Sequence, residues 1–269
     1  MNIPQSKEVA IITGGAGFLG LQHAIALIEL GVCVCLIDIN QAALDSASLR
    51  LRNLYPSSKI YTFVCDITSE FAVENVVNEI EKQLNRVDIL INNASIDHVP
   101  GSVETLDNSF ENFSLQQWNL ELAVGLTGTF LTSKYVGQVM RKNHKGVILN
   151  IASDLSVISP DQRIYQVDGA EIPFYKPVTY SAIKSGILGI TRYLATYWAP
   201  FGIRVNALSP GGVSKDQPVE FQKKLINLIP MNRMAQPDEY RGAVQFLCSD
   251  MSKYMTGQNL VIDGGRTVW

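Results

Sequence analysis

The chain has 269 residues, of which 46% are hydrophobic and 17% charged, and its formal net charge is −3. A hydrophobic fraction this high excludes a disordered or low-complexity protein. The negative charge argues against nucleic acid or an anionic membrane surface as the main partner, because both attract basic proteins. No stretch approaches the roughly 18 consecutive apolar residues that a membrane-spanning helix needs.

The N-terminal residues and the cysteines indicate in which cellular compartment the protein is found. Residues 1–7 show no basic start followed by an apolar stretch, so we expect no secretory signal. Of the four cysteines, Cys33, Cys35 and Cys65 fall in apolar strand-like runs, and the fourth is Cys248. The Cys33-x-Cys35 spacing is too short for a zinc ribbon or a C-x-x-C redox pair. We expect buried free thiols, no metal site and a cytoplasmic protein.

Short β-branched runs alternate with longer stretches of helical periodicity. In chain order, the predicted strands are 8–13, 32–37, 60–65, 87–91, 147–152, 203–208 and 260–262. The predicted helices are 17–30, 40–54, 69–84, 115–142, 179–198 and 237–249. Runs that are apolar throughout fit strands buried on both faces. The pattern predicts a single-domain α/β protein with a Rossmann-type doubly wound parallel sheet, strand order 3-2-1-4-5-6-7, between two helical layers.

Two polar segments, 97–113 and 154–178, interrupt this alternation and are too long for ordinary connections. Both follow predicted strands, and therefore lie at the carboxyl edge of the sheet. Open α/β sheets bind their ligands at that edge. Both segments are therefore candidates for functional loops.

The first strand leads directly into Thr13-Gly14-Gly15-Ala16-Gly17-Phe18-Leu19-Gly20 and then a helix. Glycines let the backbone approach a dinucleotide pyrophosphate, and the helix N-terminus supplies free N–H groups and positive potential. Such runs also form ordinary tight turns, but the strand before this one and the helix after it favour a nucleotide site.

Asp38 ends the second predicted strand. A carboxylate at this position can bond the ribose hydroxyls of NAD and repels the 2′-phosphate of NADP. Ile39 and Asn40 follow it, so neither of the next two residues is a cation suited to NADP. Asp38 therefore predicts NAD, although it could instead cap the next helix.

In Tyr180-Ser-Ala-Ile-Lys184, the i,i+4 spacing places a phenol and an ammonium on one face of a helix. A tyrosine is a weak base near neutral pH because its pKa is about 10, and a nearby positive charge favours the phenolate. This short pattern also occurs by chance on exposed helices.

Further motifs accompany these residues in order along the chain: Asp66-Ile67, Asn92-Asn93-Ala94-Ser95, Asn150-Ile151-Ala152-Ser153, Asn206-Ala207-Leu208-Ser209-Pro210-Gly211-Gly212 and Val261-Ile262-Asp263-Gly264-Gly265. With the glycine loop and the Tyr–Lys pair, they resemble the short-chain dehydrogenase/reductase (SDR) family from about residue 7 to residue 265. The resemblance implies hydride transfer between NAD and a secondary alcohol or ketone, and a homodimer or homotetramer.

Position by position, the resemblance implies a site in which Ser153 bonds the substrate oxygen, Tyr180 exchanges its proton and Lys184 holds the nicotinamide ribose. The residues expected at the cofactor are Gly14, Gly17, Phe18, Leu19, Gly20, Asp38, Asp66, Ile67, Asn92, Ala94, Tyr180, Lys184, Pro210, Gly211 and Val213.

Three features depart from the family's single-domain pattern: the glycine loop, position 125 and the length of the segment 154–178. The loop Gly14-x-x-Gly17-x-x-Gly20 has the spacing of the family's extended branch, which includes sugar epimerases and dehydratases. Gly125 stands where the family usually has a proton-relay asparagine. A backbone carbonyl or a residue from an inserted segment would then have to anchor the relay water.

The segment 154–178 makes the distance between Ser153 and Tyr180 about twice the family's usual spacing. It carries acids, tyrosines and the cations Arg163 and Lys176, which suits a polyhydroxylated ligand bearing a phosphate or carboxylate. A solvated loop or a subunit contact is the alternative. We predict Asp154 and Arg163 at the substrate, and part of the segment resembles an SDR subgroup encoded with flagellin-glycosylation and nonulosonic-acid pathways.

These observations predict an NAD-dependent oxidoreductase for a small polar substrate, such as a sugar or sugar phosphate. One alternative is a sugar epimerase or dehydratase that retains its NAD. Another is a catalytically weak protein that binds NAD as a sensor.

Overall fold

The computed structural model describes residues 8–97, 108–166 and 174–269. Within them, seven parallel strands form one sheet in the order β3-β2-β1-β4-β5-β6-β7. The strands are β1 (Val9–Thr13), β2 (Cys33–Asp38), β3 (Ile60–Val64), β4 (Ile89–Asn92), β5 (Gly146–Ile151), β6 (Ile203–Pro210) and β7 (Asn259–Ile262). The predicted strand order and parallel Rossmann-type sheet are confirmed.

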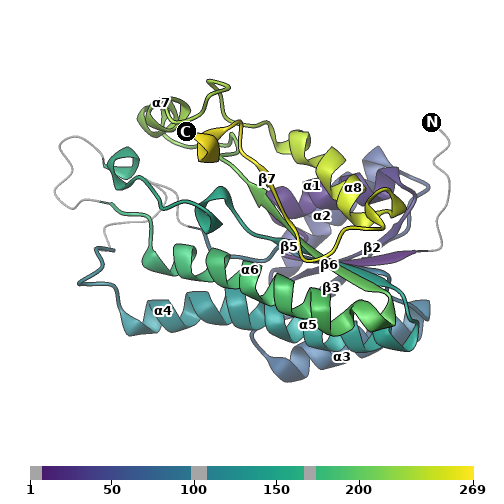
Figure 1. Cartoon of the computed structure of the whole chain (residues 1–269). Coiled ribbons are helices and arrows are strands. Elements are labelled where there is room, and N and C mark those ends of the chain that lie inside the picture. Colours follow the sequence, from purple (N-terminus) through teal and green to yellow (C-terminus); the bar gives the residue numbers. More distant parts are fainter. Residues whose placement is uncertain (1–7, 98–107, 167–173) are drawn as a thin grey trace.

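Helices cover both faces of this sheet. They are α1 (Phe18–Glu29), α2 (Gln41–Leu54), α3 (Glu70–Leu84), α4 (Leu115–Leu122), α5 (Gly128–Lys142), α6 (Val178–Trp198), α7 (Val219–Ile226) and α8 (Arg241–Cys248). In Figure 1, α1, α2 and α8 lie on one side of the sheet, and α3, α4, α5 and α6 lie on the other. Each face buries its own apolar cluster against the central strands, because β1, β2, β4 and β5 are apolar on both sides.

The predicted helix 115–142 is divided in the structure. A π-helical turn, Ala123–Thr127, separates α4 from α5. Gly125 lies in this turn against Ile183 of α6, where an added Cβ would come within 2.6 Å of the Ile183 side chain. The close approach of two helices therefore accompanies a local change in helical pitch, which periodicity alone does not predict.

Helix α7 was not predicted from the sequence, and only Leu225 in it is buried. The helix has only eight residues, about two turns, which is too short for a helical period to be recognised in the sequence. The predicted helix 237–249 begins as a 3₁₀ turn, Pro237–Tyr240, before α8.

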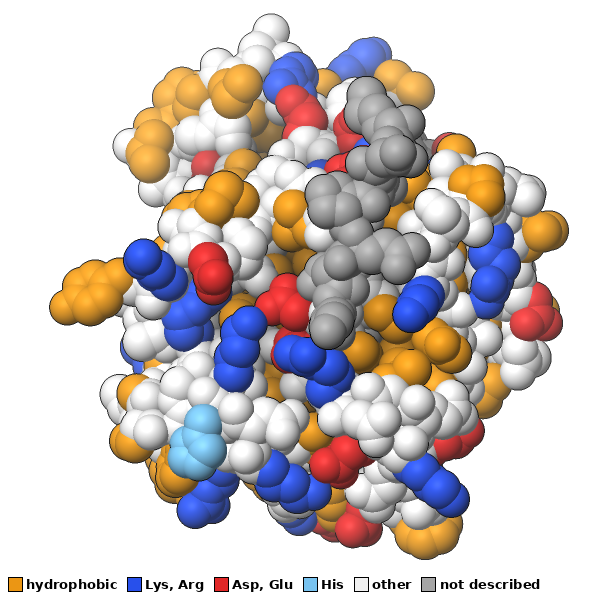
Figure 2. Space-filling model, turned by 90° about the vertical axis from the view of Figure 1, so that its right-hand side faces the viewer, with side chains coloured by type: hydrophobic (Ala, Val, Ile, Leu, Met, Phe, Trp, Pro, Cys, Tyr) orange, Lys and Arg blue, Asp and Glu red, His pale blue; other side chains and the backbone are white. Residues whose placement is uncertain are grey.

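Cys33, Cys35, Cys65 and Cys248 are free and buried, as expected. Across the described ranges, none of the helices combines the length and apolarity needed to cross a bilayer. Figure 2, which views the molecule from the right-hand side of Figure 1, shows basic and acidic side chains interspersed over that face. The charge on this face is therefore mixed rather than of one sign.

His23 is a buried histidine in α1, 1% exposed. Burial lowers the pKa of His23 to about 4, against a smaller opposing effect of the Asn93 side chain. Because this pKa lies below that of the unfolded chain, unfolding takes up a proton, and stability falls as the pH drops from about 6.5 towards 4. Between pH 7 and pH 5 we expect His23 to account for a loss of about 2 kcal/mol in the free energy of unfolding.

Chemical denaturation of the wild type and His23→Gln at both pH values measures this loss. The variant should lose less stability on acidification, whereas His144→Asn, at an exposed histidine, should behave like the wild type. Equal losses in the wild type and His23→Gln would contradict the expectation.

Candidate active site

A cavity of about 750 Å³ runs along the carboxyl edge of the sheet. A parallel sheet presents the ends of all its strands at this edge, so motifs far apart in sequence meet there. The predicted residues that line the cavity are Gly14, Gly17, Phe18, Leu19, Asp38, Asp66, Ile67, Ala94, Ser153, Asp154, Tyr180, Lys184, Pro210, Gly211 and Val213.

The glycine loop between β1 and α1 forms one end of the cavity. Gly14 has a φ of +58°, and its carbonyl accepts a hydrogen bond from Gly17 N at 3.0 Å. Gly20 packs against the back of the loop, where a Cβ would lie 2.1 Å from the Gly14 carbonyl oxygen. Gly17 starts α1 without a side-chain cap among the described residues. The first N–H groups of α1 therefore remain available to an anionic group, which fits the pyrophosphate of a dinucleotide.

Asp38 lies at the end of β2 and faces the same cavity. Its carboxylate accepts hydrogen bonds from Ala16 N at 3.3 Å and Asn40 N at 3.2 Å. The cap of α2 is Asn40, whose side chain accepts from Ala43 N at 3.0 Å. Asp38 is therefore not the helix cap, and its carboxylate is placed beside the glycine loop.

Asn92 is placed differently from its prediction. The side chain is buried behind the cavity wall and donates to Asn150 Oδ1 at 2.8 Å and to Ser133 Oγ at 2.9 Å. Its neighbour Asn93 reaches the cavity instead, and Asn93 Nδ2 donates to the carbonyls of Thr13 and Gly14. One step along an extended strand reverses the direction of the side chain, so Asn92 braces β4 against β5 and Asn93 holds the glycine loop.

Ser153, Tyr180 and Lys184 converge at the middle of the cavity. Ser153 follows β5 and forms a side-chain hydrogen bond with Tyr180 of α6. One turn along α6, Lys184 Nζ donates to the Ile151 carbonyl at 3.0 Å and lies 5.6 Å from the centroid of the Tyr180 ring. The i,i+4 spacing therefore brings the ammonium beside the phenol.

Burial raises the pKa of Tyr180 well above its usual value, and the charge of Asp97 raises it further, whereas the hydrogen bond with Ser153 lowers it. Burial lowers the pKa of Lys184 to about 8. Both groups are thus held in an environment that disfavours their charged forms. Each is most stable as an ion when the other is charged too.

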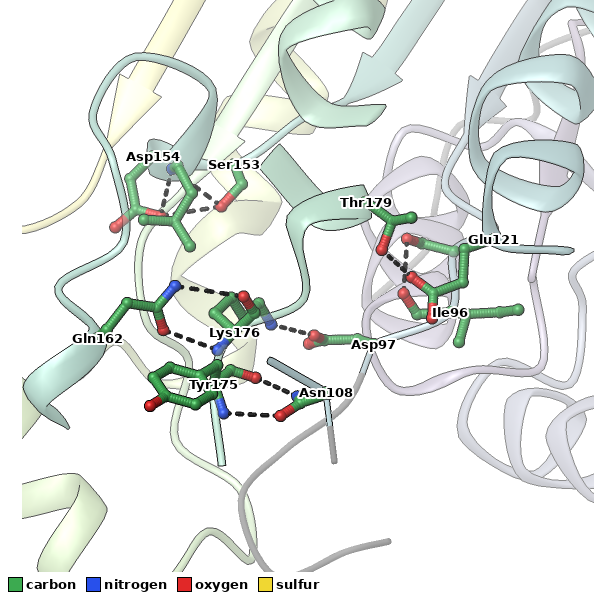
Figure 3. Close-up of polar contacts among 12 residues, drawn as sticks. Ile96, Asp97, Asn108, Glu121, Ser153, Asp154, Gln162, Tyr175, Lys176 and Thr179 are labelled. Carbon is green, nitrogen blue, oxygen red and sulfur yellow. Dashed lines mark hydrogen bonds and ion pairs between the residues drawn. The ribbon is translucent and has the colours of Figure 1, made fainter. Parts of the chain in front are cut away.

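Asp154 and Arg266 form a buried ion pair beside Ser153. Arg266 Nη1 lies 2.8 Å from Asp154 Oδ2, and the two side chains are 6% and 4% exposed. The other carboxylate oxygen of Asp154 accepts from Ser153 Oγ at 2.9 Å (Figure 3). Arg266, near the C-terminal end of the chain, therefore stabilises the carboxylate that orients Ser153.

Arg163 lies away from its predicted place. Its side chain is 89% exposed and pairs with Asp161 at 2.6 Å, within the same short turn. This local partner holds the guanidinium in solvent and outside the cavity wall. The cation that the segment 154–178 brings to the cavity is Lys176.

A family profile described as enoyl-(acyl carrier protein) reductase matches residues 16–267. The chain is 31% identical to D-threitol dehydrogenase of Mycolicibacterium smegmatis, over 97% of this chain and 93% of that protein. It is 33% identical to the NAD-dependent glycerol dehydrogenase of Listeria innocua, over 98% of this chain and 95% of that protein. A gluconate 5-dehydrogenase from Burkholderia cenocepacia, solved with NADP and tartrate, has a TM-score of 0.83 at 27% identity, over 97% of this chain and 96% of that one.

The chain belongs to the short-chain dehydrogenase/reductase family. As an SDR protein it is an NAD(P)-dependent alcohol oxidoreductase. At Gly125, the family's usual relay asparagine has no room, because Ile183 occupies the space of its Cβ. The sequence analysis did not name Asn93 or Arg266, which contribute to this SDR site. Asn93 is the neighbour of Asn92, which was predicted in its place, whereas Arg266 belongs to none of the sequence motifs.

Proposed function

We propose that this SDR protein oxidises a secondary alcohol of a small polar substrate, derived from a polyol or a sugar, with NAD as the hydride acceptor. The observation that carries the proposal is the convergence of Ser153, Tyr180 and Lys184 on the cavity that also contains the glycine loop and Asp38. The relatives named above act on polyols or a sugar acid by their names, which supports this class of substrate.

The roles of the side chains follow from their places. Bound NAD supplies the acceptor for the hydride that leaves the alcohol carbon. In this proposal, Ser153 holds the alcohol oxygen, and Tyr180 takes the hydroxyl proton as the ketone forms. Lys184 stabilises the phenolate that accepts this proton, since an opposite charge nearby favours the ionised form. The overall change is alcohol and NAD⁺ to ketone, NADH and a proton.

Charged side chains around the reacting groups favour a hydroxyl-rich substrate. Asp97, Asp154, Lys176 and Arg266 all line the cavity. Hydroxyl groups can both donate to the carboxylates and accept from the cations, whereas a wholly apolar substrate would exclude water from the two ion pairs and offer them no hydrogen bonds in its place. The polarity of the cavity therefore supports a polyol or sugar derivative over a steroid or a long acyl chain.

Purified protein should be screened with NAD against polyols, sugar acids, sugar phosphates and nucleotide sugars, with NADH absorbance as the readout. Stoichiometric NADH and ketone from a member of the first three classes supports the proposal. Product formation without net NADH, with NAD retained by the protein, would instead favour the epimerase or dehydratase that the glycine spacing leaves open. Activity confined to apolar alcohols would overturn the substrate class.

The preference for NAD is proposed on Asp38. In this proposal, its carboxylate bonds the ribose hydroxyls of NAD and repels the 2′-phosphate of NADP. We expect Asp38→Ala to reduce the ratio of kcat/KM for NAD over NADP by about tenfold or more, since a good charged hydrogen bond contributes about 1.5–3 kcal/mol. Steady-state kinetics with both cofactors measures the ratio. Asp45→Ala, at the exposed face of α2, is the control, and a wild type that uses both cofactors equally would contradict the assignment.

The outer surface of α5 and α6 supports a homodimer or homotetramer. Phe130, Tyr193 and Tyr197 are each more than half exposed there, and the two tyrosine rings stack on one another. Large apolar side chains gathered on one surface are typical of an interface between subunits. Analytical ultracentrifugation of the purified protein would measure its oligomeric state.

A further inference from the structure

A second lysine lies against the ring of Tyr180. Lys176 Nζ is 3.8 Å from the centroid of that ring, closer than the 5.6 Å of Lys184. The Lys176 side chain is buried, and its ammonium is ion-paired with the half-exposed carboxylate of Asp97. An ammonium over the face of a phenol is attracted by the ring, and is attracted more strongly when the phenol carries a charge.

Lys176 is held in this place by its neighbours (Figure 3). The Gln162 side chain bonds both backbone groups of Lys176, accepting from its N–H at 2.9 Å and donating to its carbonyl at 3.3 Å. The Asn108 side chain bonds both backbone groups of Tyr175 in the same way. Segments from 97–113 and from 154–178 thus meet at Lys176, and Pro177 follows it immediately before α6. The ammonium is therefore preorganised and does not depend on a flexible surface side chain.

We propose that Lys176 is a positioning residue that stabilises the ionised form of Tyr180, and that Asp97 weakens this effect by partly neutralising the ammonium. The proposal rests on the proposed function, since it assigns Tyr180 the role of the base. It assigns the segment 154–178 a role in the reaction. This chain would then use two lysines, one on α6 and one before it, to set the charge of a single phenol.

The charges around Tyr180 come from several elements. The titratable groups that act on it or contact it within the described residues are Lys176, Asp97, Asp154, Tyr165, Lys184 and, through Asp154, Arg266, and the Ser153 hydroxyl is its hydrogen-bond partner. Asp154 and Tyr165 have smaller effects that raise the pKa of Tyr180, but Asp154 is paired with Arg266, and burial raises the pKa of Tyr165 itself. Lys184 and the Lys176–Asp97 pair therefore remain as the groups that adjust the phenol. Asp97 also acts on the phenol directly, because its negative charge raises the pKa of Tyr180.

The proposal predicts that removing the charge of Lys176 and removing the charge of Asp97 shift the pKa of Tyr180 in opposite directions. Removing the cation in Lys176→Met should raise the pKa that controls kcat/KM for alcohol oxidation by about 1 unit or more, the lower end of the effect of a close opposite charge. Below that pKa, the rate should fall about tenfold for each unit and recover at higher pH. Removing the carboxylate in Asp97→Asn should lower the same pKa. If the ion pair only held the segment in place, both variants would change kcat/KM in the same way, without opposite shifts of the pKa.

Two measurements test this. One is the pH profile of kcat/KM, and the other is the ultraviolet titration of tyrosinate in each variant, compared with the same variant carrying Tyr180→Phe. The second needs no substrate, so it distinguishes a failure of this inference from a failure of the proposed function. Arg163→Met breaks the exposed Arg163–Asp161 pair in the same segment and should leave both curves unchanged.

Shifts of opposite sign in Lys176→Met and Asp97→Asn support the proposal. Shifts of the same sign, or no shift in either, overturn it. If Lys176→Met fails to fold, Lys176→Gln takes its place, because it also removes the positive charge; a raised pKa of Tyr180 then supports the proposal, and an unchanged or lowered pKa overturns it.

Discussion

Tyr180→Phe is expected to lower kcat/KM for alcohol oxidation at least about 100-fold, because a positioned acid–base group contributes about 10²–10⁴-fold. The substitution removes one hydroxyl and keeps the ring on which Lys176 and Lys184 pack. The cofactor cradle is formed by other elements, since Gly14 follows β1 and Asp38 ends β2. NAD binding, measured by calorimetry, should therefore stay close to that of the wild type.

The matched control is Tyr193→Phe on the same helix. Tyr193 is 65% exposed and stacks on Tyr197, away from the cavity. Its variant should retain full activity. If Tyr180→Phe turns over substrate as fast as the wild type while binding NAD equally well, the chain is the NAD-binding sensor that the loss of the relay asparagine at Gly125 leaves open, and the phenol is not its base.

The sheet could be predicted because the hydrophobic pattern of each strand is visible within a few consecutive residues. In β2, every residue before Asp38 is apolar and buried, which is typical of a strand covered on both faces of a sheet. The motifs at the strand ends could be placed for the same reason, since a parallel sheet brings Gly14, Asp38, Ser153 and Pro210 to one edge whatever the loops do. Asn92 shows the limit, because the exact end of a strand decides which of two neighbouring side chains faces the ligand.

The rest of the site depends on contacts between segments far apart in sequence. The composition of 154–178 offers both Arg163 and Lys176 as cations, and nothing in their spacing separates them. Asp161 holds Arg163 in solvent, whereas Gln162 directs Lys176 inwards. Similarly, Arg266 becomes part of the site only because β7 returns the chain to β6, which brings the end of the chain beside Asp154.

This Arg266–Asp154 pair leads to the second large effect that we expect. Arg266→Met should reduce the free energy of unfolding by about 3–5 kcal/mol, because removing one partner of a buried ion pair leaves the other charge unpaired. The carboxylate of Asp154 is 4% exposed, and its remaining hydrogen bonds come from Ser153 and Leu155. Because Ser153 donates a hydrogen bond to this carboxylate, loss of Arg266 should also disturb the orientation of Ser153, and KM for the alcohol should rise.

The double variant Arg266→Met with Asp154→Asn separates charge from packing. An amide carries no charge to bury, so the double variant should be more stable than Arg266→Met alone, as measured by urea denaturation. Arg163→Met, at an exposed pair, should leave stability nearly unchanged. An Arg266→Met protein within about 1 kcal/mol of the wild type, the range of an exposed pair, would show that Asp154 does not depend on this arginine. In that case the orientation of Ser153 would have to rest on the backbone of β5 and the turn after it, and not on the C-terminal end of the chain.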